Sequence, residues 1–281
     1  MTSLCKFLEM EHPEWYDFKE EIKEQAEEYA KTNPPEDLEG LTDCNPIKRA
    51  LISHHFTSNS PEGKRLHLDS NNGGCQLTNR IYANLWKLYC NSKKGNTWEC
   101  NDEKFVLIGR FGSDTMNSFK SIYNIFHEKF GDEAYKNVNL QEYAKLTHTI
   151  GNFTPIPFSI RFFRQHKSKC FNKHRGCNKR IEDMWDISLN GIKIHFEREY
   201  SVKIFRDYID TFCLNTYVDK DCNVRPLFNK ETRKLTPQPS PLPQTECELN
   251  EFLESANKKI IQRGTILVEI LKGNICCCEK N

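Results

Sequence analysis

Apolar side chains recur at intervals of three and four residues over much of this chain, and this helical periodicity constrains its fold more than any other feature. Such spacing places the apolar side chains on one face of a helix, which packs against a core. The pattern predicts helices at 13–31, 77–89, 116–130, 140–148, 179–197 and 202–217.

Local signals predict where helices begin and end. Asn139 is expected to cap the helix at 140–148, because a short side-chain oxygen can accept a free backbone N–H of the first turn. Thr245 and Glu248 have the spacing of a capping box and predict a last helix that begins next to them. We expect Gly264 to kink or end that last helix.

One hairpin is predicted beside these helices. Asn101 and Asp102 separate two strand-like segments at 97–100 and 104–108. Because helical segments outnumber this single hairpin, the expected fold class is α+β, mainly α-helical with a small antiparallel β element.

Composition divides the chain into four segments. We expect an acidic amphipathic helix in 1–40, a main globular domain in 41–225 and a C-terminal helix with a Cys-rich tail in 246–281. Between the last two, 226–245 contains five prolines, which exclude a helix or the interior of a sheet and predict a long exposed loop.

The cysteines and the N-terminus indicate a compartment. The chain has thirteen cysteines, an odd number, and its first six residues lack the apolar core of a signal peptide. We therefore expect reduced thiols in a cytoplasmic protein. No apolar run approaches the length of about eighteen residues that a membrane span needs, so we expect no membrane partner.

A concentrated basic stretch at 149–181 stands out in a chain whose net charge is only +1. It has no acidic residue, and five phenylalanines lie among its cations. Positive charge beside aromatic surface predicts binding of nucleic acid or of an acidic protein surface. The candidate ligand-binding residues are Arg161, Arg164, Lys167, Lys169, Asn172, Lys173, Arg175, Asn178, Lys179 and Arg180.

The same charge allows a second interpretation. Twelve acidic residues lie between Glu9 and Glu39, against three lysines. The basic stretch can contact this acidic segment within one molecule or between two copies in a homo-oligomer, and binding of external polyanions would then be weak. A third option is that the acidic segment is simply a solvated helix face.

A set of histidines and cysteines within the basic stretch raises the question of a metal. His166, Cys170, His174 and Cys177 offer the nitrogen and sulfur ligands that zinc prefers, and zinc or another divalent metal is the cofactor to consider. On a continuous helix these residues would span about 16 Å at about 1.5 Å per residue, too far for one four-ligand site. The alternative is ordinary thiols and surface histidines in a basic loop.

Arg175 and the acidic residues after it also allow two interpretations. Arg175 can present a planar fork to a phosphate or carboxylate while Asp183 or Asp186 orients it, and Asn178 can cap the following helix. Equally, Arg175, Asp183 and Asp186 can form an internal ion-pair network.

The segments HTIGNF and FNxxRGCNxxIxDxxDxxL, which ends at Leu189, resemble those of an uncharacterised family of bacterial proteins with an Ile-Gly-Asn or Ile-Gly-Gly turn and an RGCN helix start. The resemblance extends over about 51–217, with the acidic N-terminal segment and the Pro-rich C-terminal part outside it. It implies a shared fold and a shared pocket, and no known activity.

The Ile-Gly-Asn turn is also distantly similar to that of HNH-type nuclease modules, in which a histidine base and a metal activate water against a phosphodiester. That likeness implies roles for His148, Asn152 and Asn172, and it makes His148 and Asp183 the candidates for proton transfer. The chain lacks the histidine strand that precedes this turn in such modules.

The leading functional hypothesis is therefore a non-enzymatic intracellular protein that binds nucleic acid or a nucleic-acid-processing complex, for example as an inhibitor in conflicts between phages and bacteria. The alternative is a metal-dependent nuclease or nucleotide-acting enzyme. No complete catalytic motif is present in the sequence.

Overall fold

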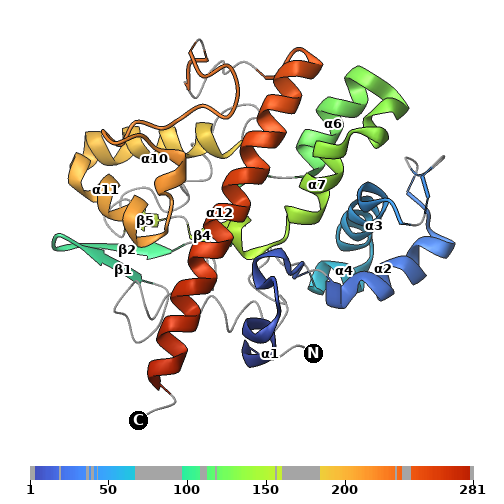
Figure 1. Ribbon diagram of the computed structural model, residues 1–281, viewed down its shortest axis with the longest axis horizontal. Helices are drawn as coiled ribbons and strands as arrows, with labels where there is room; N and C mark the ends of the chain where they lie inside the picture. Colours follow the sequence, from blue (N-terminus) through green and yellow to red (C-terminus); the bar gives the residue numbers. More distant parts are fainter. Residues whose placement is uncertain are drawn as a thin grey trace.

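A computed structural model shows the architecture of the chain (Figure 1). It describes residues 4–18, 20–35, 38, 41–42, 44–66, 97–107, 113–117, 119–155, 157–159, 184–231, 233–235 and 242–278. The longer helices are α2 (Glu20–Thr32), α3 (Pro46–Asn59), α6 (Phe119–Phe130), α7 (Val138–Leu146), α10 (Trp185–Glu199), α11 (Val202–Thr211) and α12 (Glu246–Cys278). The short ones are α1 (Leu4–Glu9), α4 (Pro61–Leu66) and the 3-10 turns η1 (Pro13–Trp15), η3 (Gly131–Lys136), η4 (Ile150–Asn152) and η6 (Asn215–Tyr217).

The strands form two small antiparallel sheets. One has the order β1 (Thr97–Cys100), β2 (Glu103–Leu107), β5 (Pro157–Ser159), and the other pairs β3 (Ser113–Thr115) with β4 (Phe153–Pro155). The hairpin turn uses Asn101 and Asp102, whose φ angles of 48° and 63° suit the tight turn that joins twisted strands. The mainly helical fold with a small antiparallel element is confirmed.

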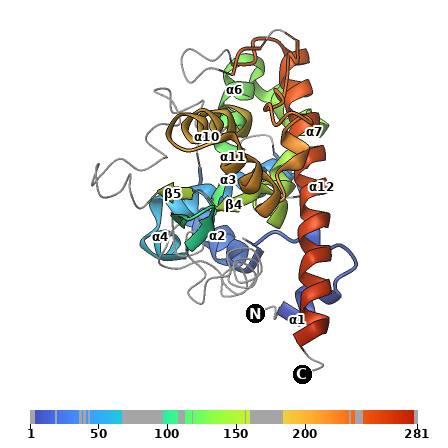
Figure 2. The ribbon, with the colours of Figure 1, turned by 90° about the vertical axis from the view of Figure 1, so that its left-hand side faces the viewer.

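Helix α12 organises the molecule. It has 33 residues, which gives a length of about 50 Å, and it runs along one side of the structure (Figures 1 and 2). The predicted capping box opens it, since the Glu248 N–H donates to Thr245 Oγ1 at 3.2 Å and the Thr245 N–H donates to Glu248. The expected break at Gly264 is absent, because the helix continues through that residue.

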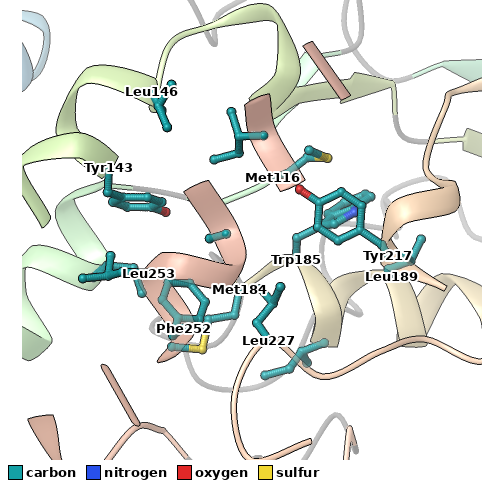
Figure 3. Close-up of a cluster of buried hydrophobic side chains, with 14 of the residues drawn as sticks. Met116, Tyr143, Leu146, Met184, Trp185, Leu189, Tyr217, Leu227, Phe252 and Leu253 are labelled. Atoms are coloured by element: carbon teal, nitrogen blue, oxygen red, sulfur yellow. The ribbon is translucent and has the colours of Figure 1, made fainter. Parts of the chain in front are cut away.

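The core lies where α12 meets α7 and α10 (Figure 3). Phe252 and Leu253 of α12 lie beside Tyr143 of α7, while Trp185 of α10 lies next to Tyr217 of η6. These side chains come from segments far apart in the sequence and are all buried. Burial of this shared apolar surface is the main force that holds the helices together.

Several predicted helix starts are displaced, and the helix predicted at 179–197, for example, begins at Trp185. The helix predicted at 13–31 corresponds to α2, which begins at Glu20, because 13–15 forms the separate turn η1. Helix α7 is capped by Asn137, whose side chain accepts from the Leu140 N–H at 2.9 Å. The amide of the predicted cap, Asn139, instead donates to Asn250 and Glu254 of α12. Asn137 also donates to Asn250 of α12 at 2.9 Å, so both asparagines join α7 to α12 and only Asn137 caps the helix.

Part of the Pro-rich stretch, at 227–233, packs on the core, whereas the prolines predict an exposed loop; 236–241 lie outside the described residues. Leu227 and Phe228 are fully buried and Arg233 is 6% exposed. Arg233 forms a buried ion pair with Asp186 of α10, and its guanidinium lies 4.0 Å from the centre of the Phe228 ring. Prolines exclude regular helix and sheet, but they do not prevent an irregular segment from packing on a core. None of the described helices has the length and hydropathy to cross a bilayer.

Candidate anion-binding site

Most of the residues that sequence patterns single out fall in the gap at 160–183 and lie outside the described residues. They are Arg161, Arg164, His166, Lys167, Lys169, Cys170, Asn172, Lys173, His174, Arg175, Cys177, Asn178, Lys179, Arg180 and Asp183. His148 is described: it follows α7, is half-buried, and its ring lies 6.4 Å from the ring of Phe153.

The Ile-Gly-Asn turn has a structural role. Asn152 is fully buried, and its amide donates to the carbonyl oxygens of Asn117 and Thr147, both at 2.9 Å. Its Oδ1 accepts from the backbone N–H of Asn117 at 3.2 Å. Because both ends of the amide are engaged inside the protein, Asn152 does not present a group to a nucleic acid, contrary to the nuclease interpretation.

Asn117 extends this network to α10. Its Oδ1 accepts from the Trp185 N–H at 3.0 Å, so α10 is capped by a residue 68 positions earlier in the chain. Met184, the residue before the helix, has no side-chain capping bond. Asn178 therefore does not cap this helix, because α10 begins several residues after it.

The turn also packs against α12. A Cβ atom at Gly151 would lie 1.9 Å from the Ile260 carbonyl oxygen, which leaves room only for glycine. Next to this contact, the buried Arg263 donates to the carbonyl oxygens of Gly151 at 2.9 Å and Phe212 at 3.1 Å. The turn, η4, is thereby fixed between α7 and α12.

Asp186 belongs to an internal ion pair, and its partner is Arg233, whereas one interpretation of the sequence pairs it with Arg175. Its carboxylate accepts from the N–H groups of Ile187 and Leu227, both at 2.9 Å, and from Arg233. The described residues thus supply Arg233, from the Pro-rich stretch, as the partner of Asp186.

No group of three or more His, Cys, Asp or Glu side chains suited to a metal gathers within the described residues. Among the described cysteines, burial and the Asp207 carboxylate raise the pKa of Cys100 to about 12. Its thiol is therefore protonated at neutral pH and donates to Asp207 at 3.0 Å. The four candidate zinc ligands at 166–177 remain a prediction.

Four cations gather around an open cavity of about 850 Å³ beside α12. Arg225, Lys230, Lys258 and Lys259 line it, and we call this feature the basic recess. Arg225 and Lys230 come from the segment after η6, while Lys258 and Lys259 project from α12. The recess therefore depends on the packing of two distant segments.

Lys259 is the innermost cation of the basic recess. Its ammonium donates to the Thr216 carbonyl oxygen and lies 5.2 Å from the centre of the Tyr217 ring. Burial, and then the positive charges of Arg225 and Lys230, lower the pKa of Lys259 to about 8. An anion in the recess would relieve this repulsion.

Three carboxylates also line the recess, and each is engaged elsewhere. Asp219 accepts from the N–H groups of Asp221 and Asn223, and the Asn223 N–H is the main cause that holds its pKa below its usual value. Glu251 accepts from the Asn229 N–H at 3.0 Å, and Glu254 from the Asn139 amide at 3.1 Å. Within the described residues none of them forms a salt bridge with the four cations.

A buried polar atom lies in the wall of the same cavity. The Thr216 hydroxyl oxygen has no hydrogen-bond partner among the described residues. A buried hydroxyl without a partner costs free energy. The recess thus combines four cations with a hydroxyl donor, a set that suits an anion with several oxygens.

The comparison with known proteins places this site in a family. The model of a family described as "Family of unknown function (DUF6994)" matches residues 76–266, about two thirds of the chain. The chain belongs to this family. No curated protein and no solved structure matches it.

The DUF6994 match begins later than the expected resemblance, at 76 instead of 51, and ends later, at 266 instead of 217. It reaches across the Pro-rich stretch and most of α12, which the sequence patterns had placed outside. All four cations of the basic recess, the Ile-Gly-Asn turn and the basic stretch at 149–181 lie within the match.

Sequence patterns missed the basic recess because its cations are scattered. Arg225 and Lys230 flank a Pro-Leu-Phe segment that reads as a loop, and Lys258 and Lys259 resemble the solvated face of an amphipathic helix. The one available signal was the adjacent lysine pair, in which Lys259 lies at the edge of the apolar face of the last helix.

Proposed function

We propose that this protein binds nucleic acid through its phosphate backbone and that the basic recess is part of the binding surface. The observation that carries the proposal is the set of four cations without a carboxylate partner in the described residues, around one open cavity. Cations that are not neutralised within the protein are available to phosphates.

The number and arrangement of the charges favour a polyanion over a small anion. A cavity of about 850 Å³ open to solvent exceeds what one inorganic phosphate fills. The basic stretch at 149–181, in the same family-matched region, adds eight further cations by sequence. Several phosphates along one strand can engage such a set, and each contact releases counterions.

The test compares two charge-matched double variants. We expect K230Q/K258Q to lower the affinity for fluorescent single-stranded DNA, duplex DNA or RNA about tenfold at low salt. The slope of the logarithm of affinity against the logarithm of salt concentration should also become less steep by roughly two, one for each lost phosphate contact. K203Q/K272Q removes the same charge from other exposed positions and should bind like the wild type.

Equal loss of affinity in both double variants would show a non-specific charge effect and would contradict the role of the recess. Absence of binding by the wild type even at low salt would contradict the proposal itself. That result would direct the search to an acidic protein partner, for which a pull-down from the native host is the assay.

Cleavage is tested on the same complexes. Adding Mg²⁺ or Mn²⁺ to bound DNA and RNA and following strand length would reveal the metal-dependent nuclease considered as the alternative. We expect binding without cleavage.

A further inference from the structure

A second cavity is lined by residues of η1, α2, α3 and α7 and of the segments next to them. It has a volume of about 470 Å³. Trp15, Tyr16, Pro46, Ala50 and Ala144 give it apolar walls. Volume and walls of this kind are typical of small-molecule sites.

We infer that this cavity is a binding site for a small flat molecule that carries one negative charge, such as an aromatic carboxylate. The inference is independent of nucleic-acid binding, because none of the lining residues belongs to the basic recess. It rests on a buried hydroxyl without a partner, an indole at the cavity wall and the balance of charges.

Ser53 provides the polar contact. It lines the cavity, is 3% exposed, and its hydroxyl oxygen has no hydrogen-bond partner among the described residues. The carbonyl of the same residue is used inside α3, where it accepts from Thr57 Oγ1 at 2.9 Å. An acceptor oxygen on a ligand would satisfy the Ser53 hydroxyl, which otherwise carries a desolvation cost.

Trp15 provides a surface for a ring. Its side chain is 39% exposed, and no ring contact joins it to another described aromatic residue. Tyr16, by contrast, packs at 5.9 Å from Phe7 and 5.6 Å from Phe18. A flat ligand can therefore pack against the Trp15 ring, while Phe7 and Phe18 hold Tyr16 in place.

Among the residues that line the cavity, three cations face two carboxylates. Asp17 and Glu20 both pair with Lys23, and Glu20 also pairs with Arg49 at 2.9 Å. These carboxylates are thus neutralised within the protein. Arg49 also pairs with Glu27, whereas Lys145, in the last turn of α7, forms no salt bridge with a described carboxylate and is the cation of the wall that an anion can engage.

The cavity is a feature of the junction between two parts of the chain. Trp15, Lys23, Arg49 and Ser53 lie before residue 76, where the family match begins, while Lys145 and His148 lie within it. The N-terminal part therefore adds a pocket to the domain that the family shares.

The test uses three fluorinated probes of similar size and different charge: 4-fluorobenzoate, 4-fluorobenzamide and 4-fluorobenzylammonium. Fluorine NMR relaxation at low-millimolar probe concentration reports binding to the full chain. We expect broadening for the benzoate, with weaker effects for the amide and the ammonium. Trp15 fluorescence should change in parallel, and the W15F variant should lose that change.

Three variants locate the site. We expect S53A to weaken binding of the benzoate about tenfold, because a hydrogen bond to a charged group is lost. K145Q should weaken it about threefold, as an exposed ion pair is worth little. K203Q removes an exposed lysine on α11, away from the cavity, and should have no effect.

No broadening for 4-fluorobenzoate would overturn the inference, as would stronger binding of the ammonium probe. Equal binding of the benzoate by wild type, S53A and K145Q would also overturn it. K145Q changes an exposed side chain, so its result does not depend on any effect of S53A on folding.

Discussion

At the scale of single residues, two buried asparagines hold three segments together. Asn117 lies between β3 and α6, and Asn152 lies in η4. The Asn117 amide donates to Asn152 Oδ1, and Asn117 Oδ1 accepts from the first N–H of α10. Both side chains are fully buried. The network satisfies backbone groups that no regular secondary structure pairs at this junction.

Asn117→Ala should therefore destabilise the protein strongly. The variant leaves the Trp185 N–H buried without its partner and removes one of the two donors to Asn152 Oδ1, so we expect a loss of about 2 to 3 kcal/mol in the free energy of unfolding. Urea denaturation of the two proteins measures it. Asn124→Ala, at a half-buried position of α6, is the matched control and should change stability by less than about 0.5 kcal/mol. A similar loss in both would argue against the network.

At the scale of elements, α12 and the turn η4 approach so closely that glycine is required. Gly264 of α12 belongs to the same contact, because a Cβ atom at Gly264 would lie 3.6 Å from the Gly151 nitrogen. The close packing of η4 accounts for a glycine at this position within the helix. Gly264 is buried in this contact. Packing here outweighs the cost of about 1 kcal/mol for a glycine within a helix.

Replacement of two glycines tests this contact. Gly151→Ala would bring a methyl group against a backbone carbonyl, and we expect a loss of about 3 kcal/mol or more because neither backbone can give way easily. Gly191→Ala, in α10, meets nothing within 4 Å and should instead stabilise the protein by about 0.5 to 1 kcal/mol. Thermal or urea unfolding would reveal the opposite signs, and a tolerated alanine at 151 would contradict the close contact.

The elements also show what a sequence can and cannot predict. Periodicity predicted the helical fold, and local motifs predicted the hairpin at Asn101-Asp102 and the capping box at Thr245, because these signals act over a few residues. The cap of α10 and the pair between Asp186 and Arg233 join residues 68 and 47 positions apart. No local pattern encodes such pairs. The basic recess escaped prediction for the same reason.

At the scale of the whole molecule, charge is nearly balanced. The net charge of +1 gives no overall attraction for a polyanion, so any such binding has to come from local asymmetry. Part of the acidic N-terminal segment is already neutralised, since Glu20 and Glu27 of α2 both contact Arg49 of α3. In the basic recess beside α12, three carboxylates line the same cavity, but none of them forms a salt bridge with the four cations among the described residues.

This asymmetry predicts a pH dependence for nucleic-acid binding. Because the pKa of Lys259 in the free protein is about 8, the side chain loses its charge as the pH rises from 7 to 9. A bound phosphate favours the charged form and raises that pKa, so binding takes up protons in this range. Affinity should decrease from pH 7 to pH 9, and titration calorimetry in buffers of different ionisation enthalpy would detect the proton uptake. In Lys259→Met both effects should be weaker.

The stability of the free protein should change in the opposite direction. The folded pKa of Lys259 lies below the value of 10.5 for a free lysine, so the unfolded chain binds more protons between pH 8 and 10.5. This group alone therefore makes folding more favourable as the pH rises through that window, while it makes nucleic-acid binding less favourable. If the affinity of the wild type stays constant from pH 7 to 9, Lys259 does not contact the nucleic acid, and the other cations of the recess account for any binding.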